Sequence, residues 1–297
     1  MTRKIDLKLV GAFIGVALIW GTTYLGIRIA VQTIPPWFVA AIRQSIASII
    51  LLVILLSQHK LAWKGWPHVR RQMLLSSLMI VIANGMTTVA EQTIPSGLTS
   101  LLNALNPLII FIGCVLLGMQ KPSWKGVLGV LFGFLGVVFI FREGLSELLD
   151  PNYKTGIMFL CFAISGWTVG TIYIKRNNHK SEDIFLDLFY QFVFSAIVQF
   201  ILAFIFSSDT KVSTWSGESL LAVSYLAIFG SVLAFFCYHY ALKRVTATEV
   251  SILTYFNTVI ALFLGWLILN EVITIDIIIA TVLIITGVVI TNYKSKK

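Results

Sequence analysis

The segment Leu9–Ile27 reads LVGAFIGVALIWGTTYLGI and contains no Asp, Glu, Lys or Arg. A helix needs about 20 predominantly apolar residues to cross the hydrocarbon core of a bilayer, so this segment is long enough to span a membrane. Nine comparable stretches follow, and only one of them carries a charge, at Arg43. In chain order they are Pro36–Ser57, Gln72–Ala90, Gln92–Gln120, Gly126–Phe141, Thr155–Ile174, Leu188–Ser208, Ser219–Leu242, Val250–Asn270 and Ile277–Tyr293. The sequence therefore predicts an all-α integral membrane protein with ten transmembrane helices.

The composition of the whole chain supports this class. Of 297 residues, 58% are apolar and 12% are charged, whereas soluble domains average about 45–50% and about 25%. A soluble fold could not bury so much apolar surface, which leaves lipid as the solvent. The first apolar stretch follows a basic start but lacks a small-residue cleavage site, so we interpret it as a retained span and not a signal peptide.

The net charge of +9 is a topology signal and does not indicate nucleic-acid binding. If the N-terminus is cytoplasmic, seventeen Lys and Arg residues fall in cytoplasmic segments and three in outer segments. Cytoplasmic loops are enriched in Lys and Arg, so this bias favours ten spans with both termini in the cytoplasm.

The two halves of the chain resemble each other. At an offset of 151, Asn106 aligns with Asn257. Nearer the start of each half the offset is 147, and Trp20 aligns with Trp167. We predict two five-helix repeats, over 1–145 and 146–297. Because five is odd, the second repeat starts on the other side of the membrane, and such inverted-topology repeats are typical of secondary transporters.

Several motifs resemble the EamA branch of the drug/metabolite transporter superfamily. They are Leu18–Tyr24 (LIWGTTY), Ala41–Arg43 (AIR), Leu105–Pro107 (LNP) and Gly265–Glu271 (GWLILNE). The resemblance implies a ten-helix fold, a bacterial inner (plasma) membrane location, and export of amino acids, other metabolites or toxic compounds. Gln120 and Thr258 depart from the family's Glu and Pro, which puts a symmetric role for those positions in doubt.

Arg43 is the residue most strongly indicated as functional. A charge inside a span is costly and marks a functional hypothesis by default. We expect Arg43 to face a cavity and meet a substrate carboxylate or form an outer gate. The alternative is that it snorkels to the outer headgroups or bonds backbone carbonyls, and snorkelling is also the interpretation favoured for Arg28.

Aromatic and amide side chains within the spans are further candidates for a cavity. Trp20 and Trp167 lie well inside their spans, Tyr24 is one turn from Trp20, and Pro107 can break its helix beside an amide pair. Ordinary helix packing is the alternative for all of them, including His239, the only histidine inside a span. With Arg43, the candidates are Trp20, Tyr24, Asn84, Asn103, Asn106, Trp167, Gln191, Tyr238, His239, Tyr255 and Asn257.

The acids lie near span ends. Asp187 and Glu249 suit the positive N-termini of helices, and Glu271 is expected to close the turn after the ninth span. Glu91 follows the third span. None of these acids is expected near the bilayer midplane, which disfavours proton coupling through a carboxylate.

Several functions are disfavoured. The spans offer no paired carboxylates, Ser/His/Asp cluster or H-E-x-x-H motif, so we predict no enzyme activity, and the three cysteines have no metal-binding spacing. We predict no cofactor, and a P-loop is absent. One deep cation is too few for phosphorylated sugars or nucleotides.

We therefore predict a secondary transporter that exports small neutral or zwitterionic metabolites, such as amino acids, by alternating access. The alternatives are a facilitative channel-like protein, a drug-efflux permease or a non-transporting membrane sensor. The expected partners are the substrate and the lipid bilayer. The oligomeric state stays open, with a homodimer among the options.

Overall fold

The computed structural model describes residues 6–141, 151–177, 183–251 and 253–292. All regular elements in this part of the chain are helical. The predicted boundary between the two repeats, at 145/146, lies outside the described residues. The first half contains α1 (Leu7–Ala30), α2 (Pro36–Ser57), α3 (Trp66–Ser76), η1 (Ser77–Gly85), α4 (Met86–Ala90), α5 (Ser96–Asn103), α6 (Asn106–Leu116) and α7 (Trp124–Phe141).

The second half has a similar order of elements. The short helix η3 (Val212–Thr214) is a 3₁₀ turn, whereas η1 and η4 are π-helical segments inside longer helices. The elements are α8 (Pro151–Arg176), α9 (Ile184–Phe206), η3, α10 (Gly217–Tyr225), η4 (Leu226–Leu233), α11 (Ala234–Leu242), α12 (Ala247–Ser251), α13 (Leu253–Leu269) and α14 (Ile275–Asn292).

Eight helical stretches in the described residues are long and apolar enough to cross a membrane. Two of them are composite: α3, η1 and α4 form one, and α10, η4 and α11 form another. The helices α7 and α14 add two shorter apolar stretches, Trp124–Gly136 and Ile275–Gly287. Many large apolar side chains, including Ile49, Phe204 and Phe263, are exposed on the outside of the bundle, which suits a surface in contact with lipid.

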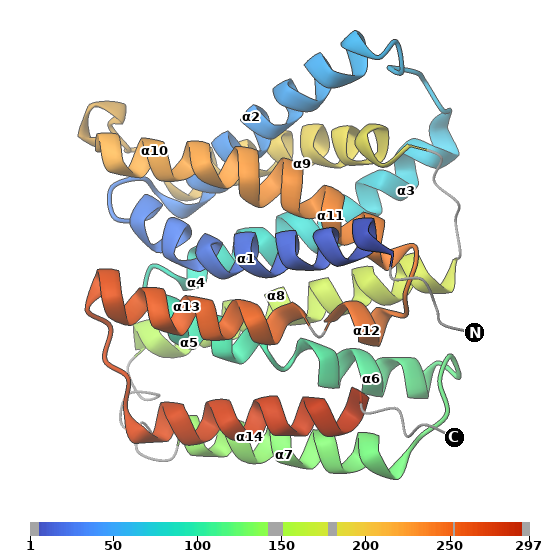
Figure 1. The fold of residues 1–297 in the computed structure, drawn as a ribbon. Coiled ribbons are helices and arrows are strands. Elements are labelled where there is room, and N and C mark those ends of the chain that lie inside the picture. The colour runs from blue at the N-terminus through green and yellow to red at the C-terminus, as the bar shows by residue number, and fades with distance from the viewer. Residues whose placement is uncertain (1–5, 142–150, 178–182, 252, 293–297) are drawn as a thin grey trace.

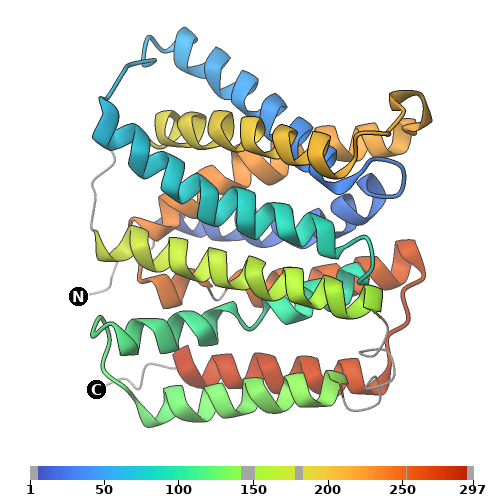
Figure 2. The same ribbon diagram turned by 180° about the vertical axis from the view of Figure 1, so that it is seen from behind.

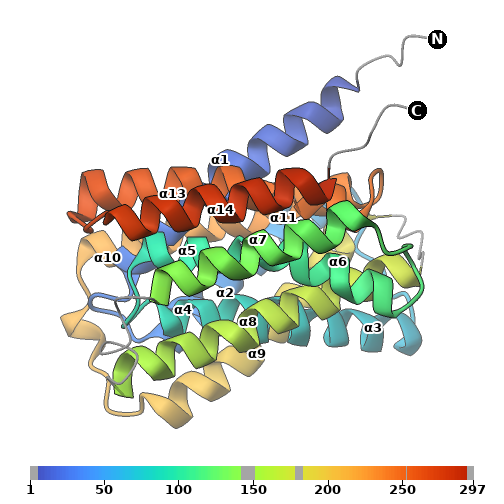
Figure 3. The ribbon, with the colours of Figure 1, turned by 90° about the horizontal axis from the view of Figure 1, so that it is seen from below.

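The helices lie roughly side by side, and elements of the two halves are interleaved. The start of α1 and the end of α14 lie at the same end of the bundle (Figure 1). The helices α7 and α14 pack together at one edge, and α2 packs against α9 at the opposite edge, as the view from behind also shows (Figure 2). Between them, α1 contacts α13 and α11, while α8 contacts η1. Seen from below, the beginning of α1 projects beyond the other helices (Figure 3).

Local sequence signals set several helix ends. Asp183 accepts from the backbone N–H groups of Phe185 and Leu186 and caps α9. Thr246 and Glu249 form a reciprocal capping box, in which the Glu249 carboxylate accepts from the Thr246 N–H. The prediction that Glu249 lies at a helix N-terminus is therefore confirmed.

The predicted break beside Pro107 is also confirmed. The fourth span divides into α5 and α6 with a gap after Asn103, and Pro107 lies in the first turn of α6. Proline has no backbone N–H to donate and is tolerated in that position. The break places Asn103 and Asn106 in the middle of the bundle, where both line a cavity.

Glu271 joins the two halves. Its backbone closes α13 as predicted, since its N–H donates to the Gly265 carbonyl at 3.1 Å beyond Asn270, which has a φ of 54°. Its carboxylate also makes hydrogen bonds to α5 that the sequence did not indicate. It accepts from the Ser96 N–H and hydroxyl, both at 2.8 Å, and from the Gly97 N–H at 2.9 Å. A negative charge thus lies at the positive N-terminus of α5.

We expect Glu271→Gln to destabilise the protein. A glutamine keeps the shape but has one acceptor oxygen, and its NH₂ group faces N–H donors. The loss of charge-assisted hydrogen bonds costs about 1.5–3 kcal/mol, which lowers the melting temperature by roughly 3–12 °C. Thermal unfolding in detergent measures this. Glu218→Gln, at an exposed acid in the first turn of α10, is the control; equal melting temperatures for the two variants would contradict the prediction.

Candidate functional site

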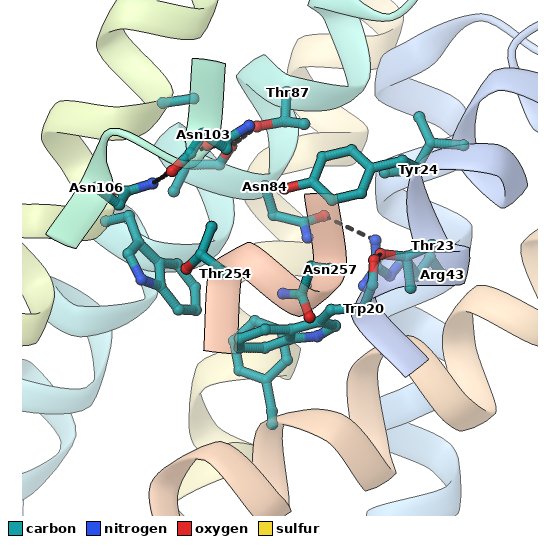
Figure 4. Close-up of a pocket in the computed structure, with 15 residues that line it drawn as sticks. Trp20, Thr23, Tyr24, Arg43, Asn84, Thr87, Asn103, Asn106, Thr254 and Asn257 are labelled. Atoms are coloured by element: carbon teal, nitrogen blue, oxygen red, sulfur yellow. Dashed lines mark hydrogen bonds between the residues drawn. The ribbon is translucent and has the colours of Figure 1, made fainter. Parts of the chain in front are cut away.

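A cavity of about 90 Å³ lies inside the bundle where helices of both halves meet (Figure 4). Its wall combines aromatic rings, amides, hydroxyls and one guanidinium group. The lining residues are Trp20, Thr23, Tyr24, Ile27, Arg43, Ala83, Asn84, Thr87, Asn103, Asn106, Ala163, Trp167, Phe235, Thr254 and Asn257.

Arg43 extends from α2 into this wall and is almost fully buried, with 1% of its surface exposed. Its Nε donates to the Ser231 hydroxyl at 2.8 Å, and its Nη1 donates to the Asn84 side-chain oxygen at 3.2 Å. Asn84 belongs to η1 and Ser231 to η4, so Arg43 connects the two π-helical segments. The snorkelling interpretation of Arg43 is wrong, because the side chain turns into the protein.

The guanidinium of Arg43 retains free donors. It carries five N–H groups, and hydrogen bonds to the described residues engage two of them. Among the described residues, no carboxylate lies within 4.0 Å of it. A buried positive charge of this kind, beside a cavity, can bind a carboxylate through two parallel hydrogen bonds.

Two tryptophans, Trp20 and Trp167, meet at one side of the cavity. The ring centroids of Trp20 and Trp167 are 5.2 Å apart, in an edge-to-face arrangement. Tyr238 packs against both, with centroids 5.2 Å from Trp20 and 5.0 Å from Trp167. The indole N–H of Trp20 donates to the Gly230 carbonyl in η4 at 3.2 Å. These contacts hold the rings as a rigid apolar surface against which part of a substrate can pack.

Amide groups form another side of the cavity. Asn103 and Asn106 lie on either side of the break between α5 and α6, and the Asn106 side-chain nitrogen donates to the Asn103 carbonyl at 3.1 Å. Thr168 from α8 donates to the Asn106 side-chain oxygen at 3.3 Å. The Asn257 amide in α13, assigned so that its nitrogen faces carbonyl groups, donates to the Ala17 carbonyl of α1 at 2.9 Å. The amides therefore connect helices of both halves and also present polar atoms to the cavity.

The structure brings most of the predicted site residues together. Eight line the cavity: Trp20, Tyr24, Arg43, Asn84, Asn103, Asn106, Trp167 and Asn257. The other four, Gln191, Tyr238, His239 and Tyr255, do not line it.

Gln191 and His239 line a second, smaller cavity near the starts of α3 and α9. There the Gln191 side-chain nitrogen donates to the Gln72 side-chain oxygen at 2.7 Å. His239 is buried and packs against Phe235 and Tyr238.

The two tyrosines serve packing. Tyr238 supports the tryptophans from behind, and its hydroxyl is hydrogen-bonded to Thr171 at 2.9 Å. Tyr255 lies in an apolar cluster with Leu101 and Leu108, and its hydroxyl has no partner among the described residues. Neither lines the central cavity, so packing is the interpretation that fits both.

Sequence reasoning missed the threonines that complete the cavity wall and the serine that accepts a hydrogen bond from Arg43. Thr23, Thr87 and Thr254 line the cavity, but single threonines in apolar spans carry no distinguishing signal. Ser231 was missed for the same reason.

Arg28 lies near the end of α1 and binds backbone carbonyl groups of a neighbouring segment. Its Nη1 donates to the backbone carbonyls of Glu91 and Gln92, the latter at 2.9 Å. It thereby attaches α1 to the carbonyl end of α4, where a helix leaves acceptors unpaired. The adjacent Glu91 side chain is fully buried, which its position near a span end did not indicate.

The described residues contain no group of three or more His, Cys, Asp or Glu side chains that could hold a metal ion. A model of the EamA-like transporter family matches residues 7–142 and 154–293. The chain belongs to this family. The resemblance inferred from its motifs is confirmed, and this EamA-family protein is a transporter and not an enzyme.

Individual relatives agree with this assignment. The transporter YoaV of Bacillus subtilis is 26% identical over 286 residues, which cover 96% of this chain and 97% of YoaV. The inner membrane transporter YedA of Escherichia coli is 32% identical over 264 residues, covering 87% of this chain and 82% of YedA. A protein crystal structure with 19% identity matches 96% of both chains with a TM-score of 0.71, which shows a shared fold.

Proposed function

We propose that this EamA-family transporter exports small neutral or zwitterionic metabolites, such as amino acids, across the bacterial inner membrane by alternating access. The ten spans comprise the eight long helical stretches together with α7 and α14. Both termini are cytoplasmic, as the bias of Lys and Arg favours. The substrate binds in the central cavity, and export is the direction that the family resemblance implies.

The observation that carries the proposed substrate class is Arg43. It is a buried cation on the cavity wall, and hydrogen bonds to the described residues use only two of its N–H donors. A substrate carboxylate would pair with it, and the rings of Trp20 and Trp167 would cover an apolar part of the same molecule. The cavity of about 90 Å³ is well below the 300–1,000 Å³ typical of pockets for drug-sized ligands, which favours small metabolites over bulky drugs.

Two observations support inverted repeats. The π-helical segments η1 and η4 begin at Ser77 and Leu226, 149 residues apart, between the two offsets found in the sequence. Each lies within the third span of its half and contributes one hydrogen-bond acceptor to Arg43. The family model also covers one range in each half. In transporters of this kind the site lies between the repeats, and rocking of one against the other alternates access.

A thermal-shift screen with matched variants tests the substrate class. We expect one or more amino acids to raise the unfolding free energy by about 2.7 kcal/mol at 100 times their dissociation constant. Trp20→Ala removes a ring that faces the cavity and should weaken that binding about tenfold, since aromatic contacts contribute about 0.5–1.5 kcal/mol beyond their area. Trp66→Ala, at an exposed ring on α3, is the control and should bind as the wild type does.

Reconstitution into liposomes then tests transport. Counterflow of the bound amino acid, with saturation, is expected of a carrier. Flux above carrier rates without counterflow would indicate a channel, and binding without flux would indicate a sensor. Stabilisation by lipophilic drugs, with none by amino acids, would replace the proposed substrate class with drug efflux.

A further inference from the structure

Glu91 is a buried acid that the proposed substrate contacts do not use. It directly follows α4, and its exposed fraction is 0%. Neither carboxylate oxygen has a hydrogen-bond partner among the described residues. Its N–H donates to the Thr87 carbonyl at 3.1 Å, so Glu91 lies one helical turn beyond Thr87, which lines the cavity.

Charged and titratable groups surround Glu91 from three sides. Tyr24 and Arg28 face it from α1, Arg43 from α2, and Glu271 from the segment after α13. The helix α8, which also packs against α4, contributes apolar residues to this region, including Leu160 and Ala163. Tyr24 and Arg43 line the central cavity, so Glu91 is electrostatically coupled to its wall.

This environment favours the protonated form of Glu91. Burial without hydrogen bonds, followed by the nearby Glu271 carboxylate, raises the pKa of Glu91 well above its usual range, while Arg28 and Arg43 oppose the shift. The position at the carbonyl end of α4 disfavours a negative charge as well. The Glu271 carboxylate, by contrast, lies at a helix N-terminus and accepts three hydrogen bonds.

We propose that Glu91 binds the proton that this transporter exchanges for its substrate. The protonated carboxyl releases its proton on one side of the membrane. The resulting carboxylate then attracts the ammonium group of a zwitterionic substrate in the cavity, whose carboxylate binds Arg43. On the other side a proton displaces the substrate. This inference rests on the proposed function for the substrate class. Exchange of one proton for one zwitterion would let the proton gradient drive export.

The protonation of Glu91 can be tested without a substrate. In infrared difference spectra between alkaline and near-neutral pH, the C=O stretch of a protonated carboxyl group should titrate in the wild type. Glu91→Gln should remove this band. Glu91→Asp should keep a carboxyl band, and Glu218→Gln, at an exposed acid, should leave the wild-type band unchanged. A wild-type band that persists in Glu91→Gln, or no such band in the wild type, would overturn the proposal.

Competition between proton and substrate is the second test, with L-threonine, L-leucine and L-phenylalanine as probes in binding and counterflow. In the wild type the apparent dissociation constant should rise about tenfold for each unit that the pH falls below the titration midpoint of Glu91. Glu91→Gln should abolish this dependence and uncouple exchange from a pH gradient. Wild-type binding that tightens or stays constant as the pH falls would overturn the proposal. If no probe binds, the proposed substrate class fails, and the infrared result alone decides whether Glu91 binds a proton.

Discussion

Arg43→Gln is expected to weaken substrate binding about 100-fold and to reduce transport accordingly. Hydrogen bonds to a charged group contribute about 1.5–3 kcal/mol, and each 1.4 kcal/mol corresponds to about a factor of ten in the dissociation constant. The upper end of this range applies because the guanidinium is buried and can bind a carboxylate through two bonds. Equilibrium binding and liposome counterflow with the amino acid found in the thermal-shift screen measure the effect.

Two variants distinguish this role from a structural one. Arg43→Lys keeps the positive charge but loses the planar fork, so we expect intermediate affinity. Gln44→Leu changes the adjacent buried residue, which does not line the cavity and whose side-chain amide has no hydrogen-bond partner among the described residues. It should bind substrate normally. The proposed role of Arg43 is refuted if Arg43→Gln transports with unchanged rate and affinity.

The second large effect is expected at Gly287, where α14 crosses α7. A Cβ atom on Gly287 would lie 2.5 Å from the Gly129 carbonyl oxygen and 3.0 Å from the Gly133 backbone nitrogen. Gly129 and Gly133 are spaced as in the G-x-x-x-G motif, which allows helix backbones to approach closely in membranes. Because the contacts are with backbone, no rotation of a side chain can relieve them.

Gly287→Leu should therefore separate α7 from α14. Overpacking costs about 1–3 kcal/mol, and at the upper end the melting temperature would fall by roughly 6–12 °C. Gly11→Leu is the matched control, because a Cβ there would meet nothing within 4 Å. Thermal unfolding in the same detergent measures both variants, and a Gly287→Leu protein as stable as Gly11→Leu would show that the helices need not approach so closely.

The spans were predictable because a helix that crosses the hydrocarbon core must have about 20 predominantly apolar residues with few charges. The second predicted span and α2 have the same bounds, since Pro36 begins the helix and polar residues follow Ser57. The third was predicted to begin at Gln72, whereas α3 begins at Trp66. The predicted span was bounded by the nearest charged residue, which is Arg71. The helix itself continues past the hydrocarbon core, because its long basic side chains can reach toward water.

The site was predictable where a residue type is costly in lipid. Arg43 and the amides stood out for that reason, whereas Trp20 and Trp167 stood out because they align between the two halves and lie well inside their spans. Eight of the predicted candidates line one cavity. The sequence carries no comparable signal for Ser231, whose role depends on a contact with a helix 188 residues away. Glu91 was placed near a span end correctly, but its burial depends on how α1, α2 and α8 pack around it, which periodicity does not reveal.

The hydrogen bond between Arg43 and Ser231 has a consequence for biosynthesis. The ribosome completes α2 long before it makes η4, so α2 enters the bilayer while its arginine still lacks that partner. An arginine at the centre of a span costs about 2.5–3.5 kcal/mol during insertion, which several Leu, Ile and Val residues at about −0.3 to −0.6 kcal/mol each can offset. The run Ile49–Leu56 (IILLVILL), which begins six residues after Arg43, supplies such residues. The apolar excess of α2 thus allows the nascent chain to carry a charge through the membrane until the other half of the protein arrives.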